Sequence, residues 1–374
     1  MTANTDMQTG TATEASVSGN AIEIDGVTVT FGAYTALDRL HLNVADGELL
    51  TVLGPSGSGK STLLNIISGT MTLGTGRIRF EGKDVTDLPP HKRRVGMVFQ
   101  KYTLFPNKTV AENVAFPLTI RKIDKAEIAR RVADTIDMVG LTAQADRYPS
   151  QISGGQAQRA AVARAVVFHP AILLMDEPLG ALDRALRKSL QVEIRSLQRR
   201  LRVPTLYVTH DQEEAMSLSD RIVILRDGSI AAQGAPRDLY ENPNSRWTAT
   251  FLGDANCLPV EGAVEKDGDR MRARVTGGWA VPVHVNAGTE TCGDRVVVIR
   301  PENCTILREP GAAGGTLPAT VKWVEFLGSV QRVRLEAGPH ELTVDLPGRH
   351  TGVAAGEAVH VGWESEHALV VPAD

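Results

Sequence analysis

The chain has 374 residues, of which 42% are hydrophobic and 22% charged, a composition typical of globular protein with two or three domains. Its 40 Lys and Arg against 44 Asp and Glu give a net charge of −4, which argues against a nucleic-acid-binding surface spread over the whole molecule. No run reaches the roughly 18 apolar residues that a membrane-spanning helix needs, and we expect a cytoplasmic chain.

The first 20 residues are rich in Thr, Ser and Ala, with neither a basic start nor an apolar core. We therefore expect residues 1–20 to form a disordered tail rather than a signal peptide. The cysteines have no metal-ligand spacing, and we interpret them as small apolar residues in a reducing compartment. They are Cys257, Cys292 and Cys304.

Residues 21–48 alternate apolar and polar positions, which predicts an antiparallel β flap. Beyond the flap, short apolar runs alternate with helical patterns. The predicted strands are residues 49–54, 95–100, 172–178, 205–210 and 221–228. The predicted helices are residues 60–69, 125–139, 155–168, 184–201 and 211–218. This alternation is typical of an α/β domain with a largely parallel central sheet, to which we assign residues 21–242.

The pattern changes after about residue 243. Residues 234–256 at the junction predict two short helices. Short alternating strands with Gly and Pro turns then follow to the end of the chain. They are residues 270–275, 279–285, 294–301, 320–328, 331–337, 340–346, 357–363 and 367–372. We expect residues 243–374 to form an all-β domain of the small-barrel kind.

A glycine-rich loop joins the predicted strand at residues 49–54 to the predicted helix at residues 60–69. It fits the pattern G-x-x-x-x-G-K-[ST] through Gly54, Pro55, Ser56, Gly57, Ser58, Gly59, Lys60 and Ser61. Glycines let backbone N–H groups turn inward around phosphates, and the following helix points its positive end at the anion. Lys60 can reach the β and γ phosphates, and the Ser61 hydroxyl can bind Mg²⁺. An ordinary Gly-rich turn is the alternative, but the flanking strand and helix favour a nucleoside triphosphate site.

Two acids stand at the end of a second apolar strand, in "ILLMDEP" at residues 172–178. Asp176 is placed to orient Mg²⁺ through water, as P-loop enzymes require. Glu177 is suited to polarise the attacking water. A helix N-cap or a solvated turn would explain the same two residues.

A second anion-binding helix start is predicted at "SGGQAQR", residues 153–159. Ser153 and the N–H groups of Gly154 and Gly155 could hold a phosphate. One nucleotide has only one γ-phosphate, so the attractive explanation is that this start closes on a nucleotide held by another copy. An ordinary capped helix is the alternative.

Taken together, these motifs resemble those of the nucleotide-binding subunits of ATP-binding cassette (ABC) transporters. Residues 54–62 resemble the Walker A loop and residues 172–178 the Walker B strand with its catalytic glutamate. "ISGGQAQR" resembles the signature motif, with Ile152 where the family usually has Leu. "VFQ", "GALD" and "VTH" resemble the Q-loop, the D-loop at residues 180–183 and the switch histidine. The family fold adds a helical subdomain to the β flap and the P-loop domain.

The resemblance implies a role for each of these residues. Glu177 would be the general base, His210 would bind the γ-phosphate, and Gln100 would touch Mg²⁺ and sense the membrane partner. Phe31 would stack on adenine, with Tyr34 as the competing choice. The implied Mg²⁺ set is Ser61, Gln100 and Asp176. The implied nucleotide-binding set is Phe31, Gly54, Pro55, Ser56, Gly57, Ser58, Gly59, Lys60, Ser61, Thr62, Gln100, Ser153, Gly154, Gly155, Gln156 and Asp183.

The family also implies an assembly. Two cassettes pack head to tail, with ATP between the Walker A loop of one copy and the signature motif of the other. Since this chain has a single cassette, it would pair with a second ATPase subunit, as a homodimer in the simplest case. Two membrane permease subunits and, indirectly, a solute-binding protein complete the importer, which places the chain at the cytoplasmic face of the inner membrane.

The C-terminal half resembles the OB-type regulatory (TOBE) domain of importer ATPases, through "VVVIRPENC" and "VGWESEHALVV". Residues 100–118 resemble the polyamine and ferric iron importers, so a polyamine is the first expectation; ferric iron, 2-aminoethylphosphonate, sulfate or a sugar are the alternatives. Two rivals were a non-transport ABC ATPase, which would need an insertion or a second cassette, and an OB-fold nucleic-acid binder. The aromatic residues of this half are too scattered for such a binder, and no nucleic-acid partner is expected. They are Trp247, Trp279, Trp323, Phe326 and Trp363.

Overall fold

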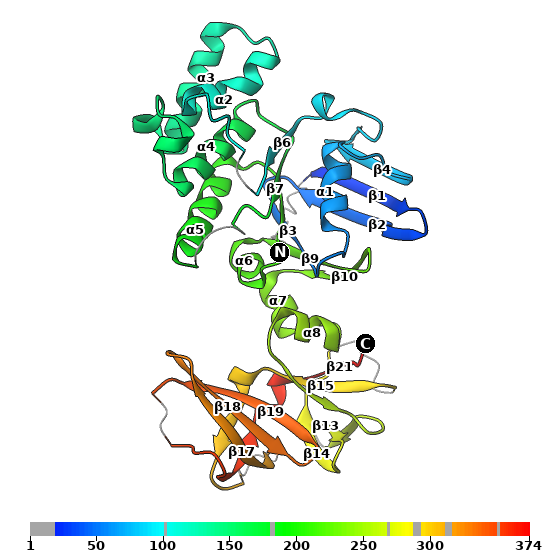
Figure 1. Ribbon diagram of the computed structural model, residues 1–374. Helices are drawn as coiled ribbons and strands as arrows, with labels where there is room; N and C mark the ends of the chain where they lie inside the picture. Colours follow the sequence, from blue (N-terminus) through cyan, green and yellow to red (C-terminus); the bar gives the residue numbers. More distant parts are fainter. Residues whose placement is uncertain are drawn as a thin grey trace, which may run out of the picture. The chain divides into compact units, whose positions relative to one another are not determined.

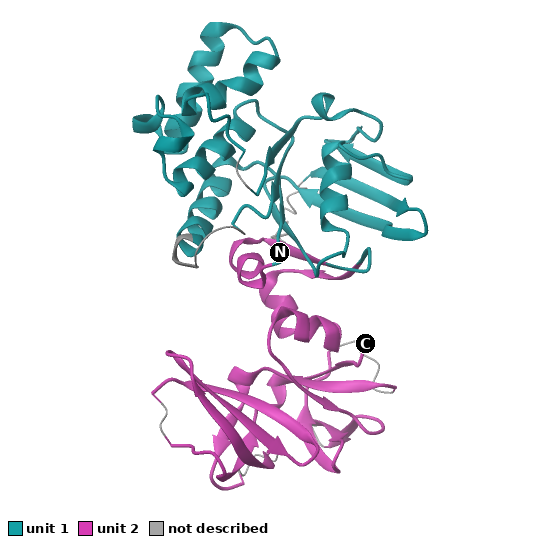
Figure 2. Cartoon of the chain, in the orientation of Figure 1, with its two compact units in different colours: residues 1–210, 225–229 teal, residues 211–224, 230–374 magenta. Residues whose placement is uncertain are grey.

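The computed structural model describes residues 19–100, 103–179, 184–267, 270–286, 293–310, 316–349 and 352–374. By its contacts the chain divides into two compact units (Figure 2). Unit 1 holds residues 1–210 and 225–229, and unit 2 holds residues 211–224 and 230–374. The domain boundary at residues 242–243 stays a prediction. The predicted disordered tail lies outside the described residues as far as residue 18, and Asn20 already begins the first strand.

The predicted β flap is a four-stranded sheet in the order β2-β1-β4-β5 (Figure 1). Strands β1 (Asn20–Phe31) and β2 (Tyr34–Ala45) pair antiparallel, as the alternation of residues 21–48 predicted. Strands β4 (Thr75–Phe80) and β5 (Lys83–Asp84) complete the sheet and had not been predicted. Both are short and mostly polar, so period-two alternation is hard to see in them.

The central sheet has six strands in the order β10-β9-β3-β8-β7-β6. They are β3 (Leu49–Leu53), β6 (Val95–Val98), β7 (Ile172–Asp176), β8 (Thr205–Val208), β9 (Arg221–Arg226) and β10 (Ser229–Gly234). Strands β3, β8, β7 and β6 run parallel to their neighbours, which confirms the predicted parallel sheet. Every residue of β3 and β8 is buried, as expected for strands covered on both faces.

The predicted helices are present within two residues of their expected ends. They are α1 (Lys60–Ser68), α3 (Lys125–Met138), α4 (Gly154–Val166), α5 (Arg184–Leu201) and α6 (Gln212–Leu218). Helix α2 (Val110–Ile120) was missed because Pro117 inside it speaks against a helix. Its capping box, in which Thr109 and Glu112 exchange hydrogen bonds, is the signal that could have found it. Short 3₁₀ turns lie at Pro90–Lys92, Thr142–Gln144, Pro149–Gln151, Pro301–Asn303 and Ser365–His367.

Helices α2, α3 and α4 form the helical subdomain, grouped apart from α1 and the flap in Figure 1. They share an apolar core to which α2 gives Val110, Val114 and Leu118. Facing residues of α3 and α4 include Ile136 and Ala160. Helix α4, with the signature motif at its start, is therefore held in place by the apolar core of the helical subdomain.

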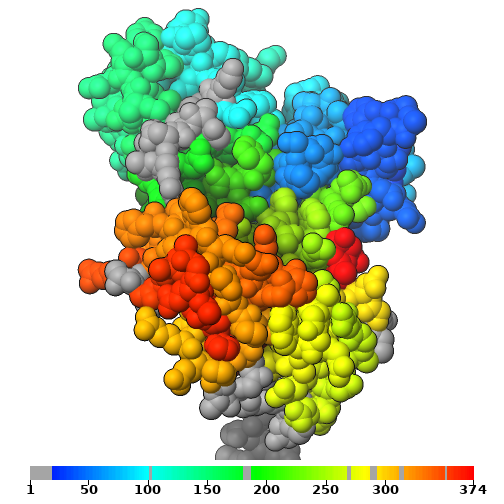
Figure 3. Space-filling model, turned by 60° about the horizontal axis from the view of Figure 1, so that its bottom comes forward, coloured from blue at the N-terminus to red at the C-terminus, as the bar shows by residue number. Residues whose placement is uncertain are grey.

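In unit 2, two short helices lead into an all-β domain, as predicted. The helices are α7 (Pro236–Glu241) and α8 (Arg246–Leu252). The strands form three sheets, β11-β15-β21, β12-β13-β14 and β16-β20-β17-β18-β19, around one buried core. Figure 3 shows the orange segment of β17 to β19 directly beside the yellow segment of β13 to β15.

Eight strands of the all-β domain lie at the predicted segments, and three short ones, β11, β12 and β16, had not been predicted. The strands of this domain are β11 (Asn256–Pro259), β12 (Glu265–Asp267), β13 (Arg270–Val275), β14 (Trp279–Val283), β15 (Arg295–Ile299), β16 (Thr305–Leu307), β17 (Thr316–Phe326), β18 (Val330–Ala337), β19 (His340–Pro347), β20 (Ala358–Gly362) and β21 (Ala368–Pro372).

A buried arginine ties the two short helices to β15. Arg300, which is 5% exposed, donates from Nη2 to the Tyr240 carbonyl at 3.0 Å and from Nη1 to the Ala249 carbonyl at 2.9 Å. Its guanidinium lies 3.9 Å from the centre of the Tyr240 ring, and the Tyr240 hydroxyl donates to Glu302 at 2.8 Å. Burial and this carboxylate raise the pKa of Tyr240 to about 12. The "RPE" segment thus satisfies carbonyl groups of α7 and α8 that the helices themselves leave open.

Replacing Arg300 by Met should destabilise unit 2, because the buried carbonyls of Tyr240 and Ala249 lose their donor. We expect a loss of about 1–3 kcal/mol in the free energy of unfolding, the cost of a buried polar group without a partner. Urea titration followed by tryptophan fluorescence would measure it. Arg334→Met, at an exposed position of β18, is the matched control and should change stability by about 0.5 kcal/mol or less. Equal losses in the two variants would contradict the role of Arg300.

Candidate nucleotide-binding site

The glycine-rich loop lies between buried strand β3 and helix α1, as predicted. Gly57 and Gly59 have φ angles of 81° and 105°, in the left-handed region that side chains rarely adopt. At Gly54 a Cβ atom would lie 2.4 Å from the Leu225 carbonyl oxygen, so only glycine fits there. Pro55, Ser56 and Gly57, in the middle of the loop, are exposed to solvent.

The side chain of Lys60 is held beneath this loop. It is 8% exposed, and its Nζ donates to the carbonyl oxygens of Gly54 and Pro55, both at 2.8 Å. Burial lowers the pKa of Lys60, against the opposing effect of the carboxylates of Glu177 and Asp176. The Ser58 hydroxyl is buried with no hydrogen-bond partner among the described residues. The loop thus combines a poorly solvated cation with a spare polar group, which suits an anionic ligand.

The two acids lie at the carboxyl end of β7, beside this loop. Parallel strands place their carboxyl ends at one edge of a sheet, and β3, β8 and β7 are parallel neighbours. Glu177 has a φ of 42°, a strained conformation for a residue with a side chain, and its N–H donates to the Val208 carbonyl at 2.9 Å.

Three predicted catalytic residues meet at this carboxylate. Its Oε1 lies 3.0 Å from Nδ1 of His210, and its Oε2 accepts a hydrogen bond from Nε2 of Gln100 at 3.4 Å. The three side chains come from the ends of three strands, β6, β7 and β8, that are remote in sequence. The Glu177 side chain is 26% exposed and that of His210 61% exposed, so the carboxylate is the less exposed of the two groups.

Asp176 is half-buried next to this group. Burial and the charge of Glu177 raise its pKa, and Lys60 opposes the shift. Because the folded-state pKa is above the unfolded one, the ionised carboxylate at neutral pH destabilises the fold in the absence of a cation. A bound cation would therefore stabilise the ionised Asp176 carboxylate.

Asp176→Asn should therefore raise the melting temperature of the nucleotide-free protein at pH 7. The gap to wild type should narrow as the pH falls and close below about 4, the ordinary pKa of Asp, because the wild-type carboxyl is then protonated in both the folded and the unfolded state. Calorimetric scans across this pH range would measure it. A melting temperature below wild type at pH 7 would mean that Lys60 more than compensates the burial of Asp176.

The predicted second anion-binding helix start is the N-terminus of α4. Ser153 is its N-cap: the Ser153 Oγ accepts from the Gln156 N–H at 3.3 Å, and the Gln156 Oε1 accepts from the Ser153 N–H at 3.0 Å. Ser153 and Gly154 are exposed, whereas Gly155 is buried. This helix belongs to the helical subdomain, which is drawn apart from α1 in Figure 1.

The two candidate aromatic residues face each other at the tip of the flap. Phe31 and Tyr34 are paired across β1 and β2, and their exposed fractions are 50% and 53%. The Tyr34 hydroxyl donates to the Gly57 carbonyl at 2.8 Å, a contact with the glycine-rich loop that the sequence did not signal. Asp183 and the rest of the predicted D-loop, residues 180–183, lie outside the described residues.

A groove of about 660 Å³ opens beside Gln100 and Asp176. Four phenylalanines line it, Phe99, Phe105, Phe116 and Phe168. The Phe105 and Phe116 rings lie 4.4 Å apart between centroids, and Phe99 is 42% exposed. Arg164 closes one side by donating to the Thr103 carbonyl at 2.8 Å. The sequence had marked residues 100–118 only by resemblance, because the groove forms where β6, α2 and α4 meet.

None of the helices in the described residues has the length and apolar character needed to cross a membrane. In that same part of the chain, no cluster of three or more His, Cys, Asp or Glu could hold a metal by itself. A strand, a glycine-rich loop and a helix, with two carboxylates at the end of the parallel strand β7, define a P-loop nucleoside triphosphatase.

Comparison with known proteins narrows this class. The ABC transporter family model matches residues 37–180, and the TOBE domain model matches residues 297–371. The spermidine/putrescine import ATP-binding protein PotA of Nitratidesulfovibrio vulgaris is 42% identical over 366 residues, covering 94% of this chain and 98% of that protein. The sulfate/thiosulfate import ATP-binding protein CysA 2 of Chromobacterium violaceum is 47% identical over 82% of this chain and 81% of its own.

Two further proteins agree. The Fe(3+) ions import ATP-binding protein FbpC of Agrobacterium fabrum is 43% identical, covering 83% of this chain and 86% of that protein. The solved structure of cbiO1 from Clostridium perfringens, part of the ABC transporter complex cbiONQ, matches 59% of this chain and 90% of that one, with a TM-score of 0.55 and 26% identity. The chain belongs to the ABC transporter family, as an import ATPase with a C-terminal TOBE domain. The predicted family and fold class are thereby confirmed.

Proposed function

We propose that this ATPase powers polyamine import as one of two ATP-hydrolysing subunits at the cytoplasmic face of the inner membrane. The observation that carries the catalytic part is the convergence of Gln100 and His210 on Glu177, beside Lys60. A second copy, two membrane permease subunits and a solute-binding protein complete the importer.

In this mechanism the glycine-rich loop binds the triphosphate of ATP. The backbone of residues 54–59 wraps the phosphates, Lys60 exchanges its carbonyl partners for phosphate oxygens, and the hydroxyls of Ser61 and Thr62 lie at the helix start. Phe31 stacks on adenine at the flap tip, while Tyr34 orients Gly57. The positive end of α1 favours the same anion.

The metal donor set fits Mg²⁺. Ser61, Gln100 and Asp176 offer a hydroxyl, an amide oxygen and a carboxylate, and Mg²⁺ is commonly held by one or two carboxylates plus substrate phosphates. The ion would supply charge neutralisation at the β and γ phosphates.

For hydrolysis, Glu177 accepts the proton of the attacking water. Its carboxylate is held in place by His210 and Gln100, and its backbone by Val208. His210 is exposed enough to turn toward the γ-phosphate and stabilise the charge that develops there. Because Gln100 also lines the neighbouring groove, a change in its contacts at the site would alter the wall of that groove.

Lys60→Ala should weaken ATP binding at least about tenfold, because a buried phosphate charge loses its partner. Calorimetric titration with ATP would measure the dissociation constant. Lys92→Ala, at an exposed position outside the loop, should bind ATP like wild type. Unchanged affinity in a folded Lys60→Ala protein would mean that the loop is not the phosphate site.

The two nucleotide sites are shared between copies. Ser153, Gly154, Gly155 and Gln156 of one copy, with Asp183, close on the nucleotide held by the other, because α4 stands apart from α1 within one chain. Binding closes the dimer and hydrolysis reopens it, which makes a two-state switch biased by a ligand. The aromatic groove beside Gln100 would then receive a cytoplasmic segment of the permease.

The solute assignment draws on the relatives' names. The match to the PotA relative spans nearly the whole length of both proteins, which supports a polyamine as the solute. The FbpC and CysA relatives support ferric iron and sulfate as alternatives. A sugar and 2-aminoethylphosphonate remain alternatives from the sequence. The C-terminal domain would regulate transport.

Co-purification with the membrane partners, followed by binding of labelled spermidine, ferric iron or sulfate to the assembled importer, would identify the solute. Stimulation of ATP hydrolysis by nucleic acid but not by membrane partners would overturn the importer function.

A further inference from the structure

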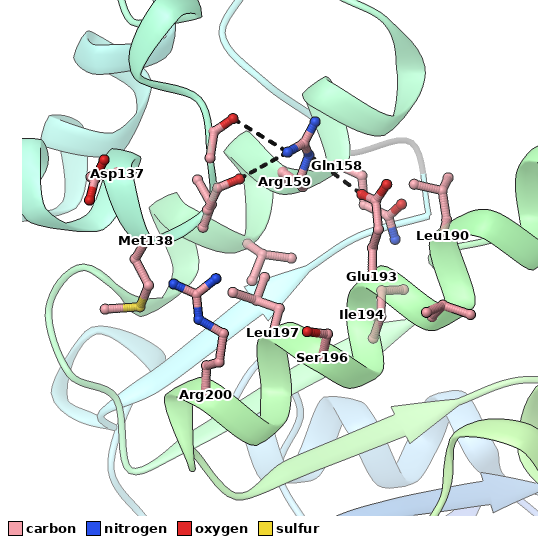
Figure 4. Close-up of a pocket in the computed structure, with 14 residues that line it drawn as sticks. Asp137, Met138, Gln158, Arg159, Leu190, Glu193, Ile194, Ser196, Leu197 and Arg200 are labelled. Carbon is pink, nitrogen blue, oxygen red and sulfur yellow. Dashed lines mark hydrogen bonds and ion pairs between the residues drawn. The ribbon is translucent and has the colours of Figure 1, made fainter.

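A second cavity, of about 420 Å³, lies between the end of α3 and helices α4 and α5 (Figure 4). Its residues come from 137–140, 158–162 and 190–200. None belongs to the glycine-rich loop or to the predicted catalytic set, but Gln158 and Arg159 are the last two residues of the signature motif. Much of the wall is apolar. These apolar residues are Met138, Val139, Val162, Leu190, Ile194 and Leu197.

One polar side chain in this wall is buried without a partner. Gln158 is 2% exposed, yet neither its Oε1 nor its Nε2 has a hydrogen-bond partner among the described residues. A buried amide in this state costs stability, and native structures contain few of them. The side chain could have been apolar without loss to the fold, so its presence calls for a partner from outside the chain.

Three charged side chains of this wall, Asp137, Arg159 and Glu193, have contacts within the chain. Arg159 donates from Nη1 to the Val139 carbonyl at 3.1 Å, and its Nε lies 3.5 Å from Oε2 of Glu193, as the dashed lines of Figure 4 show. Asp137 accepts from the Thr142 hydroxyl at 3.2 Å. Gln158 is therefore the side chain in this wall that has both of its polar atoms buried and without a hydrogen-bond partner among the described residues. Its amide offers one acceptor oxygen and two donor hydrogens.

We propose that this cavity binds a small planar molecule that carries a carboxamide or lactam group on an apolar ring. Such a group offers the complement of the Gln158 amide: its N–H donates to Oε1, and its carbonyl accepts from Nε2. The ring lies against the apolar wall of Val162, Leu190 and Ile194. A few placed polar groups in an apolar cavity are what small-molecule sites have in common.

Leu190 links the cavity to the first turn of α4, where the signature motif lies. A Cβ atom added to Gly155 would lie 3.0 Å from Leu190 Cδ2, so Leu190 packs against the first turn of α4. A ligand that displaces Leu190 must move that turn, which Ser153 caps. This regulatory consequence rests on the proposed function of Ser153, whereas binding itself does not.

The binding test uses benzamide as the probe and toluene as its apolar match, with the full chain labelled at its methionine methyl groups. Met138 lines the cavity, so its methyl resonance, assigned with Met138→Leu, reports occupancy there. Benzamide should bind about tenfold more weakly to Gln158→Met, which keeps the volume but removes both polar atoms. Toluene should bind both proteins alike. Equal benzamide affinity in the two proteins, or no shift of the Met138 resonance, would overturn the proposal.

Two further readouts separate the possible failures. Gln158→Met should melt at a higher temperature than wild type, since an unpartnered amide is removed; a lower melting temperature would show that Gln158 already has its partners and would overturn the site. Benzamide should change the rate of ATP hydrolysis in wild type and not in Gln158→Met. Binding at Met138 with an unchanged rate would leave the site standing and overturn only its link to the signature turn.

Discussion

Glu177→Gln should lower the rate of ATP hydrolysis about 10²- to 10⁴-fold while leaving ATP binding intact, the loss expected when a general base is removed. The amide keeps the shape of the carboxylate and can still face Nδ1 of His210 and Nε2 of Gln100. It cannot take a proton from water. The phosphate site around Lys60 is untouched, so the variant should accumulate as an ATP-bound dimer.

Single-turnover hydrolysis and equilibrium ATP binding, measured on the same preparation, would separate the two effects. Glu81→Gln is the matched control, since Glu81 lies on the surface in an ion pair with Arg94. It should hydrolyse ATP like wild type. A Glu177→Gln protein with a near wild-type rate would remove this residue from the mechanism.

A mixed dimer of Ser153→Arg and Lys60→Ala copies should retain one working nucleotide site. If each site joins the Lys60 of one copy to the Ser153 of the other, both lesions fall in the same site, and the second site is intact. The bulky arginine at the exposed N-cap blocks closure over a γ-phosphate, but the Walker A loop of that copy still binds ATP. A photoreactive ATP analogue should therefore label the Ser153→Arg copy at its own loop and the Lys60→Ala copy near Ser153.

The matched control places both substitutions in one copy and pairs it with wild type. In the shared arrangement this dimer has no intact site, although it carries the same two lesions. Purified through two different affinity tags, it should trap no nucleotide under conditions in which the first dimer does. The opposite pattern, labelling in the control and none in the first dimer, would mean that each copy builds its site alone.

Much of this protein could be predicted from local patterns. The glycine-rich loop, the acids after residue 175 and the capped start at Ser153 are each short, and their chemistry lies in residue type and spacing. The parallel sheet followed from buried apolar runs that alternate with helices, because both periods are visible in one segment of chain. Helix α2 was not predicted because Pro117 lies inside it, although the residues of its capping box, Thr109 and Glu112, could have been recognised in the sequence.

Only the tertiary structure decided which of these pieces meet. Gln100, Glu177 and His210 are joined because three parallel strands end at one edge of the sheet, a neighbourhood that no sequence spacing encodes. The same holds for the contact of Tyr34 with Gly57 and for the anchoring of α7 and α8 by Arg300. The unpartnered state of Gln158 is likewise a tertiary property, since burial and hydrogen-bond partners depend on what α5 brings against α4. The sequence by itself determined the fold class and the chemistry of the motifs, because these depend on neighbours along the chain; packing decided the rest, because it depends on neighbours in space.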